Sequence, residues 1–115
     1  MHLKEDQQLE EFLKEITFSK DYIDFAIENY SIIPKVLMEN IIGYVQKGER
    51  LGGFLHALFS NDLMRSIAQA DDTNIKLIPL YCRFIYMECP SKCHGSYEIV
   101  EAWQQNKGQQ QELNE

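Results

Sequence analysis

The chain has 115 residues and a formal charge of −7, with 44% hydrophobic and 11% aromatic residues. This length suits one domain, and the apolar content is enough for one core, which excludes a wholly disordered chain. No apolar run approaches the roughly 18–20 residues of a membrane-spanning helix, and the first residues lack the apolar stretch of a signal peptide. We therefore expect a cytosolic protein that does not bind membranes.

The negative charge is concentrated at the amino-terminal end. Residues 1–30 carry eight acidic residues and three lysines, whereas residues 31–115 carry ten acidic and eight basic residues. Nucleic-acid binding depends largely on Lys and Arg at phosphates, so this balance argues against direct binding to nucleic acid. An acidic surface could instead meet a basic protein, although charge that serves only solubility is the simpler explanation.

Two helical patterns occupy the first thirty residues. Apolar residues recur from Leu9 to Ile16 at the i, i+3, i+4, i+7 spacing of an amphipathic helix, which predicts a helix over residues 4–16. Ser19 can cap a second helix over residues 20–30. Because the three residues between these segments are only weak helix breakers, one bent helix is an alternative.

Proline and glycine divide the middle of the chain. Pro34 suits the first turn of a helix, and Gly48 is expected to end that helix. The glycine-rich turn GERLGG then leads to a helix from about Gly53. Residues 60–62 either cap a new helix or lie within one that continues to Ala70.

The next helix is expected to follow the N-cap candidates in residues 71–74 and to end at Cys89-Pro90. Pro79 is awkward within it, because an internal proline removes a hydrogen bond and clashes with the preceding turn. The helix should therefore kink there, or its regular part should begin just before it. Gly95-Ser96 can cap a last short helix over residues 97–103.

These elements predict an all-α, compact single domain of five or six short helices. An acidic helical segment, residues 1–30, should pack on a helical core of residues 31–104, followed by a disordered polar tail, residues 105–115. The predicted core includes Phe12, Ile27, Leu37, Ile41, Phe54, Leu55, Leu58, Leu63, Leu77, Phe84, Val100 and Trp103.

The cysteines and histidines do not form a recognised site. Cys89-x3-Cys93-His94 supplies three possible ligands close together, but structural zinc needs four, and none of Cys82, His56 and His2 is at a standard spacing. We expect reduced thiols that pack as small apolar groups, and no metal. The chain lacks G-x-S-x-G, a phosphate loop and H-E-x-x-H, so we expect no catalytic residues, no cofactor and no enzyme activity.

Two further patterns are weak. Gly52-Gly53 before a helix could receive an anion on free N–H groups, but the lysine usual in such loops is absent, and a tight turn is the simpler explanation. A helix-turn-helix around GERLGG is disfavoured because the following helix opens with apolar residues such as Phe54 and Leu55 rather than basic ones.

Polar residues from Asn61 to Asn74 surround two consecutive helix ends. Helix capping is the simplest explanation for them, and a recognition surface is the alternative. Together with acidic residues of the first two helices, they give the candidate binding residues Glu10, Glu11, Asp24, Glu28, Asn61, Asp62, Arg65, Asp72 and Asn74.

A family resemblance rests on Ile33-Pro34, GGFLHALFSNDL (52–63), Ala70-Asp71, Asn74, Ile85-Tyr86, Pro90, Gly95-Ser96 and Trp103. Over about residues 30–103, the chain resembles a small uncharacterised family of phages, prophages and bacterial genomes with the pattern G-x-F-L-x-A-x-L-x-N-D-L. Phe59 departs from the pattern's leucine but remains apolar, Pro79 leaves the course of its helix open, and residues 1–30 look like an extension. The resemblance implies a compact helical fold and a phage or mobile-element context, and it supplies no catalytic residues.

Two functions follow as hypotheses. The first is a non-catalytic interaction protein, an inhibitor or adaptor of phage origin that binds a host protein in the host cytosol through its acidic surface. The alternative is a protein that binds or sequesters a small, nucleotide-like ligand, using the Gly52–Gly53 amides with Arg50, Arg65 and nearby polar residues. The oligomeric state stays open, and a homodimer is one option.

Overall fold

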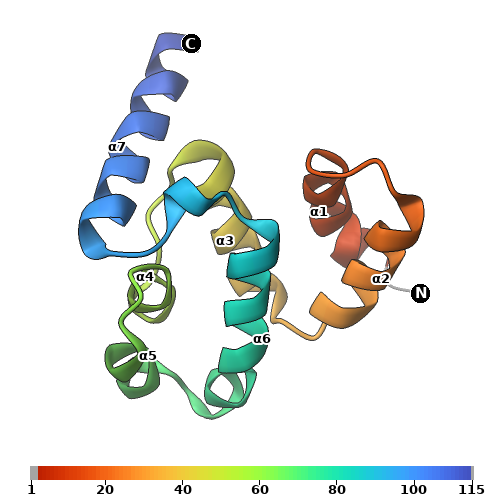
Figure 1. Cartoon of the computed structure of the whole chain (residues 1–115), viewed down its shortest axis with the longest axis horizontal. Coiled ribbons are helices and arrows are strands. Elements are labelled where there is room, and N and C mark those ends of the chain that lie inside the picture. Colours follow the sequence, from red (N-terminus) through yellow and green to blue (C-terminus); the bar gives the residue numbers. More distant parts are fainter. Residues whose placement is uncertain (1–2, 115) are drawn as a thin grey trace.

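The computed structural model describes the backbone of residues 3–114 and the side chains of residues 7–109. This part of the chain holds seven α-helices, one short 3-10 helix and no strand, which confirms the all-α class (Figure 1). In chain order these are α1 (Leu3–Lys14), α2 (Lys20–Tyr30), α3 (Lys35–Lys47), α4 (Gly53–Phe59), α5 (Leu63–Gln69), α6 (Asp72–Glu88), η1 (Ser91–Cys93) and α7 (Tyr97–Asn114). Among the described residues, no helix combines the length and apolar character needed to span a membrane.

The predicted five or six helices fall short of seven because two N-caps each start a new helix. The Ser19 hydroxyl accepts a hydrogen bond from the Tyr22 N–H at 3.1 Å, so α1 and α2 are two helices rather than one. The Asp62 carboxylate likewise accepts from the Arg65 N–H at 3.1 Å. Asn61, with φ of 64°, reverses the chain just before this cap, so α4 and α5 are also separate.

Helix α6 runs through Pro79 without ending there. Its start is fixed by the Asp71 carboxylate, which accepts a hydrogen bond from the Asn74 N–H at 2.7 Å. Pro79 itself is exposed, while Ile78 and Tyr81 beside it are buried. Apolar burial on both sides of the proline therefore offsets the hydrogen bond that it cannot make.

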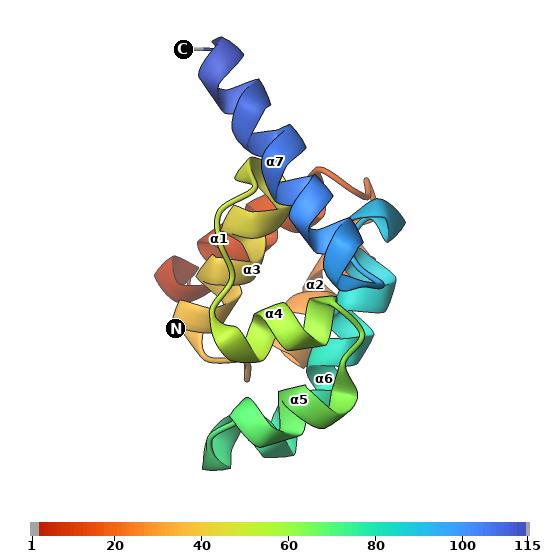
Figure 2. The ribbon, with the colours of Figure 1, turned by 90° about the vertical axis from the view of Figure 1, so that its left-hand side faces the viewer.

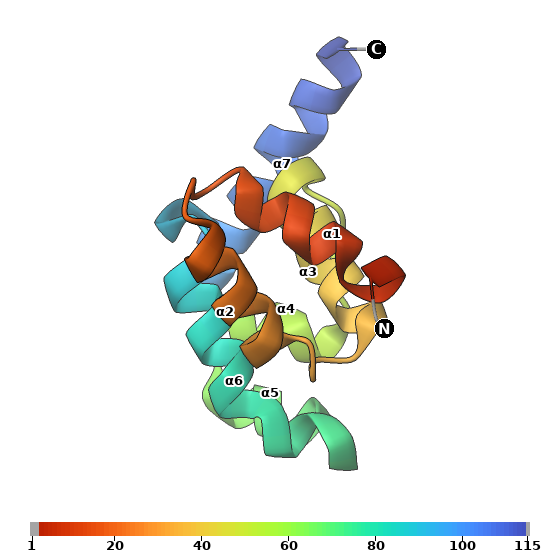
Figure 3. The same cartoon turned by 90° about the vertical axis from the view of Figure 1, so that its right-hand side faces the viewer.

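The acidic segment is joined to the rest of the domain by aromatic packing. In Figure 1, α3 and α6 lie between the α1–α2 pair and the α4–α5 pair, and Figure 3 shows α1 in front of α3. Phe84 of α6 is fully buried, and its ring lies 5.9 Å from Phe12 of α1 and 4.8 Å from Tyr30 of α2. Both amino-terminal helices thus contribute to the same core.

Helix α7 closes the domain over the turn that follows α3. The Trp103 indole N–H donates to the Tyr44 carbonyl at 3.0 Å. Gly48 ends α3 with φ of 73°, and a Cβ placed on it would lie 2.9 Å from the Gln104 carbonyl oxygen. This position therefore requires glycine for its left-handed backbone and for the close approach of α7.

The predicted end of the last helix near Trp103 is wrong, since α7 continues to Asn114 (Figure 2). The residues beyond it are mostly glutamine, glutamate and lysine, which are good helix formers. A methyl group added at Gly108 would meet no atom within 4 Å, consistent with the projecting helix end in the figure. The disorder predicted for residues 105–115 concerns motion and stays a prediction.

Most of the predicted core is correct. The buried members are Phe12, Ile41, Phe54, Leu55, Leu58, Phe84 and Val100. Four others, Ile27, Leu37, Leu77 and Trp103, are partly buried at its edge. Leu63 is wrong, because it is 53% exposed: α5 turns Ser66 toward the interior instead, and the Ser66 hydroxyl donates to the Asp62 carbonyl at 2.7 Å.

Candidate interaction surface

The outer face of α2 carries an acidic stripe formed by Asp21, Asp24, Phe25 and Glu28. These residues are all exposed and follow the i, i+3, i+4, i+7 spacing that places them on one side of a helix. Phe25 is 59% exposed, and its ring lies 6.3 Å from the ring of Tyr22. The stripe therefore combines negative charge with an exposed aromatic ring.

Two of the predicted acidic binding residues have lysine partners one turn away. Glu10 lies 3.2 Å from Lys14, and Asp24 lies 3.4 Å from Lys20. Such exposed pairs contribute little to stability and can exchange partners, so they reduce the local charge without removing the surface. Glu11 is also exposed and accepts a hydrogen bond from a glutamine on the same helix.

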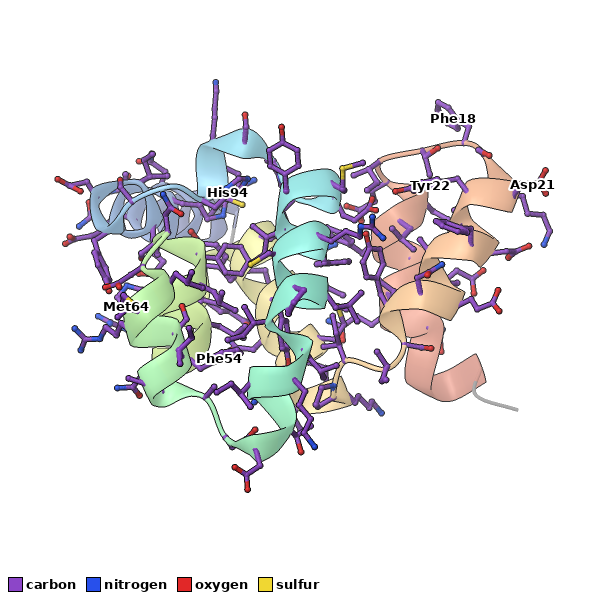
Figure 4. The ribbon with its side chains drawn as sticks, turned by 60° about the horizontal axis from the view of Figure 1, so that its bottom comes forward. Phe18, Asp21, Tyr22, Phe54, Met64 and His94 are labelled. Atoms are coloured by element: carbon purple, nitrogen blue, oxygen red, sulfur yellow. The ribbon has the colours of Figure 1, made fainter. Side chains whose placement is uncertain are left out.

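A groove of about 390 Å³ adjoins the stripe through Tyr22, between the α1–α2 loop and the carboxyl end of α6. It is lined by Ile16, Thr17, Tyr22, Met87, Glu88, Cys89 and Pro90. Ile16 and Met87 are both exposed, and Phe18 projects into solvent from the same loop (Figure 4). The groove thus has apolar walls with an acidic residue among them.

Glu88 is the unusual member of this groove, because it is a carboxylate only 4% exposed. The hydroxyls of Tyr22 and Tyr30 both donate to its Oε2 atom, the second at 3.1 Å. The hydrogen bond to Glu88, together with burial and the charge of Glu88, raises the pKa of Tyr22 to about 12. Burial first, and then Glu88, raises the pKa of Tyr30. Both tyrosines therefore remain protonated donors at neutral pH.

The apolar spacing of α6 in the sequence already marks Glu88. Glu88 follows Tyr81 by seven residues, Phe84 by four and Ile85 by three, so it continues the buried stripe of α6. An acidic residue in an apolar stripe must be paired or open onto a site.

The polar residues predicted between Asn61 and Asn74 do not form one surface. Asn61, Asp62 and Arg65 lie at the start of α5, whereas Asp72 and Asn74 lie beyond its other end. The start of α5 thus keeps Asn61, Asp62 and Arg65 together. The start of α6 holds Asp72 and Asn74.

Both halves of this cluster have structural partners. Asp62 accepts a hydrogen bond from the Tyr97 hydroxyl at 2.6 Å, which lowers the pKa of Asp62 and raises that of Tyr97. Asn74 is buried and accepts from the Tyr81 hydroxyl at 2.7 Å. Asn74 therefore stabilises α6 and is not available to a macromolecular partner.

A second, more polar cleft of about 490 Å³ shares Arg50 with the site of the ligand hypothesis, but Gly52, Gly53, Asn61 and Asn74 do not line it. Arg50, His56, Tyr97 and Glu101 are among its lining residues, and the His56 and Tyr97 rings lie 5.4 Å apart. Arg65 is not among them. The glutamate in its wall would repel a phosphate.

The Gly52 amide is already used within the protein. Its N–H donates to the Asn40 side-chain oxygen at 3.1 Å, and the Asn40 amide nitrogen donates to the Arg50 carbonyl at 2.9 Å. This asparagine clamps the glycine-rich turn and occupies one of the two amides that the ligand hypothesis required.

The cysteines separate into two sets. Cys89 and Cys93 are buried, and a hydrogen bond between their thiols, with burial, raises the pKa of Cys89. Cys82 is exposed and lines a different hollow together with His94. Burial lowers the pKa of His94. Within the described residues, no group of three or more His, Cys, Asp or Glu side chains is placed to hold a metal ion.

No known protein family matches the chain, and no curated protein or solved structure is significantly similar to it.

Proposed function

We propose that this protein is a non-catalytic interaction protein that binds a basic surface of a host protein through the α1–α2 pair. The observation that carries the proposal is the acidic stripe, in which Asp21, Asp24 and Glu28 surround the exposed ring of Phe25. Aromatic residues are enriched at protein–protein contacts, and surrounding charge sets the preferred partner and speeds association.

The attachment of the stripe to the core supports this proposal. Tyr30 of α2 packs on Phe84 and donates to Glu88, and Phe12 of α1 packs on the same phenylalanine. A surface held in this way loses little conformational entropy when a partner binds. Binding to a nucleic acid is disfavoured because the carboxylates would repel its phosphates. We further propose that the protein originates from a phage or mobile element and acts as an inhibitor or adaptor in the bacterial cytosol.

The test compares two triple variants with the same change of charge. The first neutralises the stripe with Asp21→Asn, Asp24→Asn and Glu28→Gln. The matched control neutralises exposed acidic residues on α3, in the turn that follows it and on α7 with Glu39→Gln, Glu49→Gln and Glu98→Gln. Deletion of α1 is unsuitable, because Leu9, Phe12 and Leu13 are buried core residues.

Each tagged protein is incubated with bacterial host lysate at low and at high salt, and captured proteins are identified by mass spectrometry. The wild type and the control should capture the same partner at low salt, and the stripe variant should lose it, since exposed charges act over about a Debye length. The proposal is refuted if the wild type captures no protein, or if the stripe variant captures the partner as well as the control does.

The polar cleft supports a second candidate function, the binding of a small ligand, because Arg50, His56 and Tyr97 all line it. Native mass spectrometry of the purified protein would show a phosphorylated small molecule if this candidate is correct. That molecule should be lost in Arg50→Ala and retained in Arg83→Ala, an exposed arginine on α6.

A further inference from the structure

The groove between the α1–α2 loop and the end of α6 indicates which side chain the partner presents. We propose that it receives a lysine or arginine of the partner protein, flanked by apolar residues that pack on Ile16 and Met87. This inference rests on the proposed function and assigns chemistry to the contact next to the acidic stripe.

The rim of the groove is apolar. Ile16 and Met87 are 45% and 59% exposed at the groove, and Phe18 is fully exposed on the same loop. Neighbouring exposed apolar residues of this kind mark contact sites for other macromolecules. Lysine and arginine suit such a groove, because their aliphatic stems pack on apolar walls while the charged group reaches a polar atom.

The carboxylate of Glu88 lies in the wall of the groove. Its Oε2 atom accepts from both tyrosines, and no hydrogen bond from the described residues reaches its Oε1 atom. In the described part of the chain, the Ser60 hydroxyl is the polar side-chain atom that is both fully buried and without a hydrogen-bond partner. Oε1 of Glu88 also lacks a partner among these residues but is not fully buried, so it is accessible where Glu88 lines the groove. Glu88 therefore offers one acceptor atom to a side chain entering from outside.

Among the described residues, no lysine or arginine lies within ion-pair distance of Glu88. Arg83 is near enough to lower the pKa of Tyr30 but forms no such pair. A buried carboxylate is costly unless it is paired, so a cation supplied by the partner would stabilise the carboxylate of Glu88. The neighbouring acidic stripe would attract the same basic segment.

The test uses random peptides displayed on phage and selected on the immobilised full-length protein. Enriched peptides should carry a lysine or arginine between apolar residues. Their affinities are then measured by fluorescence anisotropy for the wild type and for Glu88→Gln. Binding should weaken by about 10-fold or more in Glu88→Gln, which is typical for loss of a hydrogen bond to a charged group. Replacing the peptide's arginine by citrulline, or its lysine by norleucine, should have a similar effect.

Circular dichroism would reveal any misfolding of Glu88→Gln. A pair of methionine variants tests the groove independently of that variant. Met87→Ala removes part of the groove wall, and Met64→Ala removes a methionine that is 80% exposed on α5 (Figure 4). The peptides should bind Met87→Ala about 4-fold more weakly or worse, the effect of one buried methylene. Met64→Ala should bind them as the wild type does.

The inference is overturned if no peptide is enriched, if enriched peptides lack a basic residue, or if the folded groove variants bind them as the wild type does. It is also overturned if the groove variants convert a dimer to a monomer, since a second copy would then occupy the groove. Failure of the proposed function looks different: the stripe variant would keep its lysate partner while the groove variants lose the peptides. If the stripe variant loses the partner and the groove variants keep their peptides, only the groove inference fails.

Discussion

Replacement of Phe84 by alanine is the most direct test of how the acidic segment is attached. Phe84 is fully buried in α6, and its ring contacts Phe12 of α1 and Tyr30 of α2. The Tyr30 contact has an edge-to-face geometry, with centroids 4.8 Å apart and planes at 81°. Truncation to alanine leaves a cavity on which two helices from the amino-terminal segment converge.

The expected loss in the free energy of unfolding is about 3–5 kcal/mol, the usual range for a buried phenylalanine truncated to alanine. Domains of this size are stable by only about 5–15 kcal/mol, so the variant should be close to unfolding at physiological temperature. With an unfolding entropy of about 2 cal/mol/K per residue, the melting temperature should fall by roughly 12–20 °C. Urea denaturation followed by circular dichroism measures the first quantity, and a thermal scan measures the second.

Phe25→Ala is the matched control, because Phe25 is an aromatic residue of α2 that faces solvent. It should change stability by less than about 0.5 kcal/mol. If Phe84→Ala also cost less than about 1 kcal/mol, α1 and α2 would not be packed on α6, and the fixed acidic stripe would lose its basis.

Three further predictions concern a turn, pH and metal. Gly48→Ala should lower the free energy of unfolding, measured by urea denaturation, by more than about 1 kcal/mol, because alanine is strained at positive φ and its Cβ would meet the Gln104 carbonyl at 2.9 Å. Gly52→Ala is the control and should not show this loss, because the atom nearest to its Cβ is 3.9 Å away. Tyr22 should not affect the free energy of unfolding below its ordinary pKa of 10.0. The free energy of unfolding should fall as pH rises from there toward 12, because the folded state holds the Tyr22 proton more tightly. The free energy of unfolding should fall less over this range in Tyr22→Phe, and an equal fall would contradict the prediction. Chelators should leave the melting temperature unchanged, and stoichiometric zinc with a collapse of the melting temperature on chelation would show the expectation to be wrong.

Local signals predicted most of the helix boundaries. Ser19, Gly48 and Cys89-Pro90 each act through neighbouring backbone groups, and the structure places a helix start or end at each of them. Such signals are readable in a single sequence because the hydrogen bonds they make span only three or four residues.

Tertiary context decided the points that the sequence left open or misplaced. Leu63 continues an apolar spacing, yet it faces solvent because the Asp62 cap and the turn at Asn61 rotate α5 so that Ser66 is buried. The cluster expected around residues 61–74 is split because α5 separates its two ends. Spacing along the chain describes a helix face, but it does not determine which neighbour that face meets.

The groove depends on tertiary packing to a greater extent still. Its residues come from the α1–α2 loop, from α2 and from the end of α6, and the Tyr22–Glu88 hydrogen bond joins positions that are 66 residues apart. In the sequence, residues 1–30 form one acidic region. The structure adds the buried carboxylate of Glu88, which comes from outside that region and lies directly beside it. Glu88 accepts hydrogen bonds from two tyrosines of α2 and also lines the groove, so the side chain that holds the acidic stripe in place is the one that we propose as the anchoring point for a partner. A partner that supplied a cation to Glu88 would therefore bind at the contact that orients the stripe.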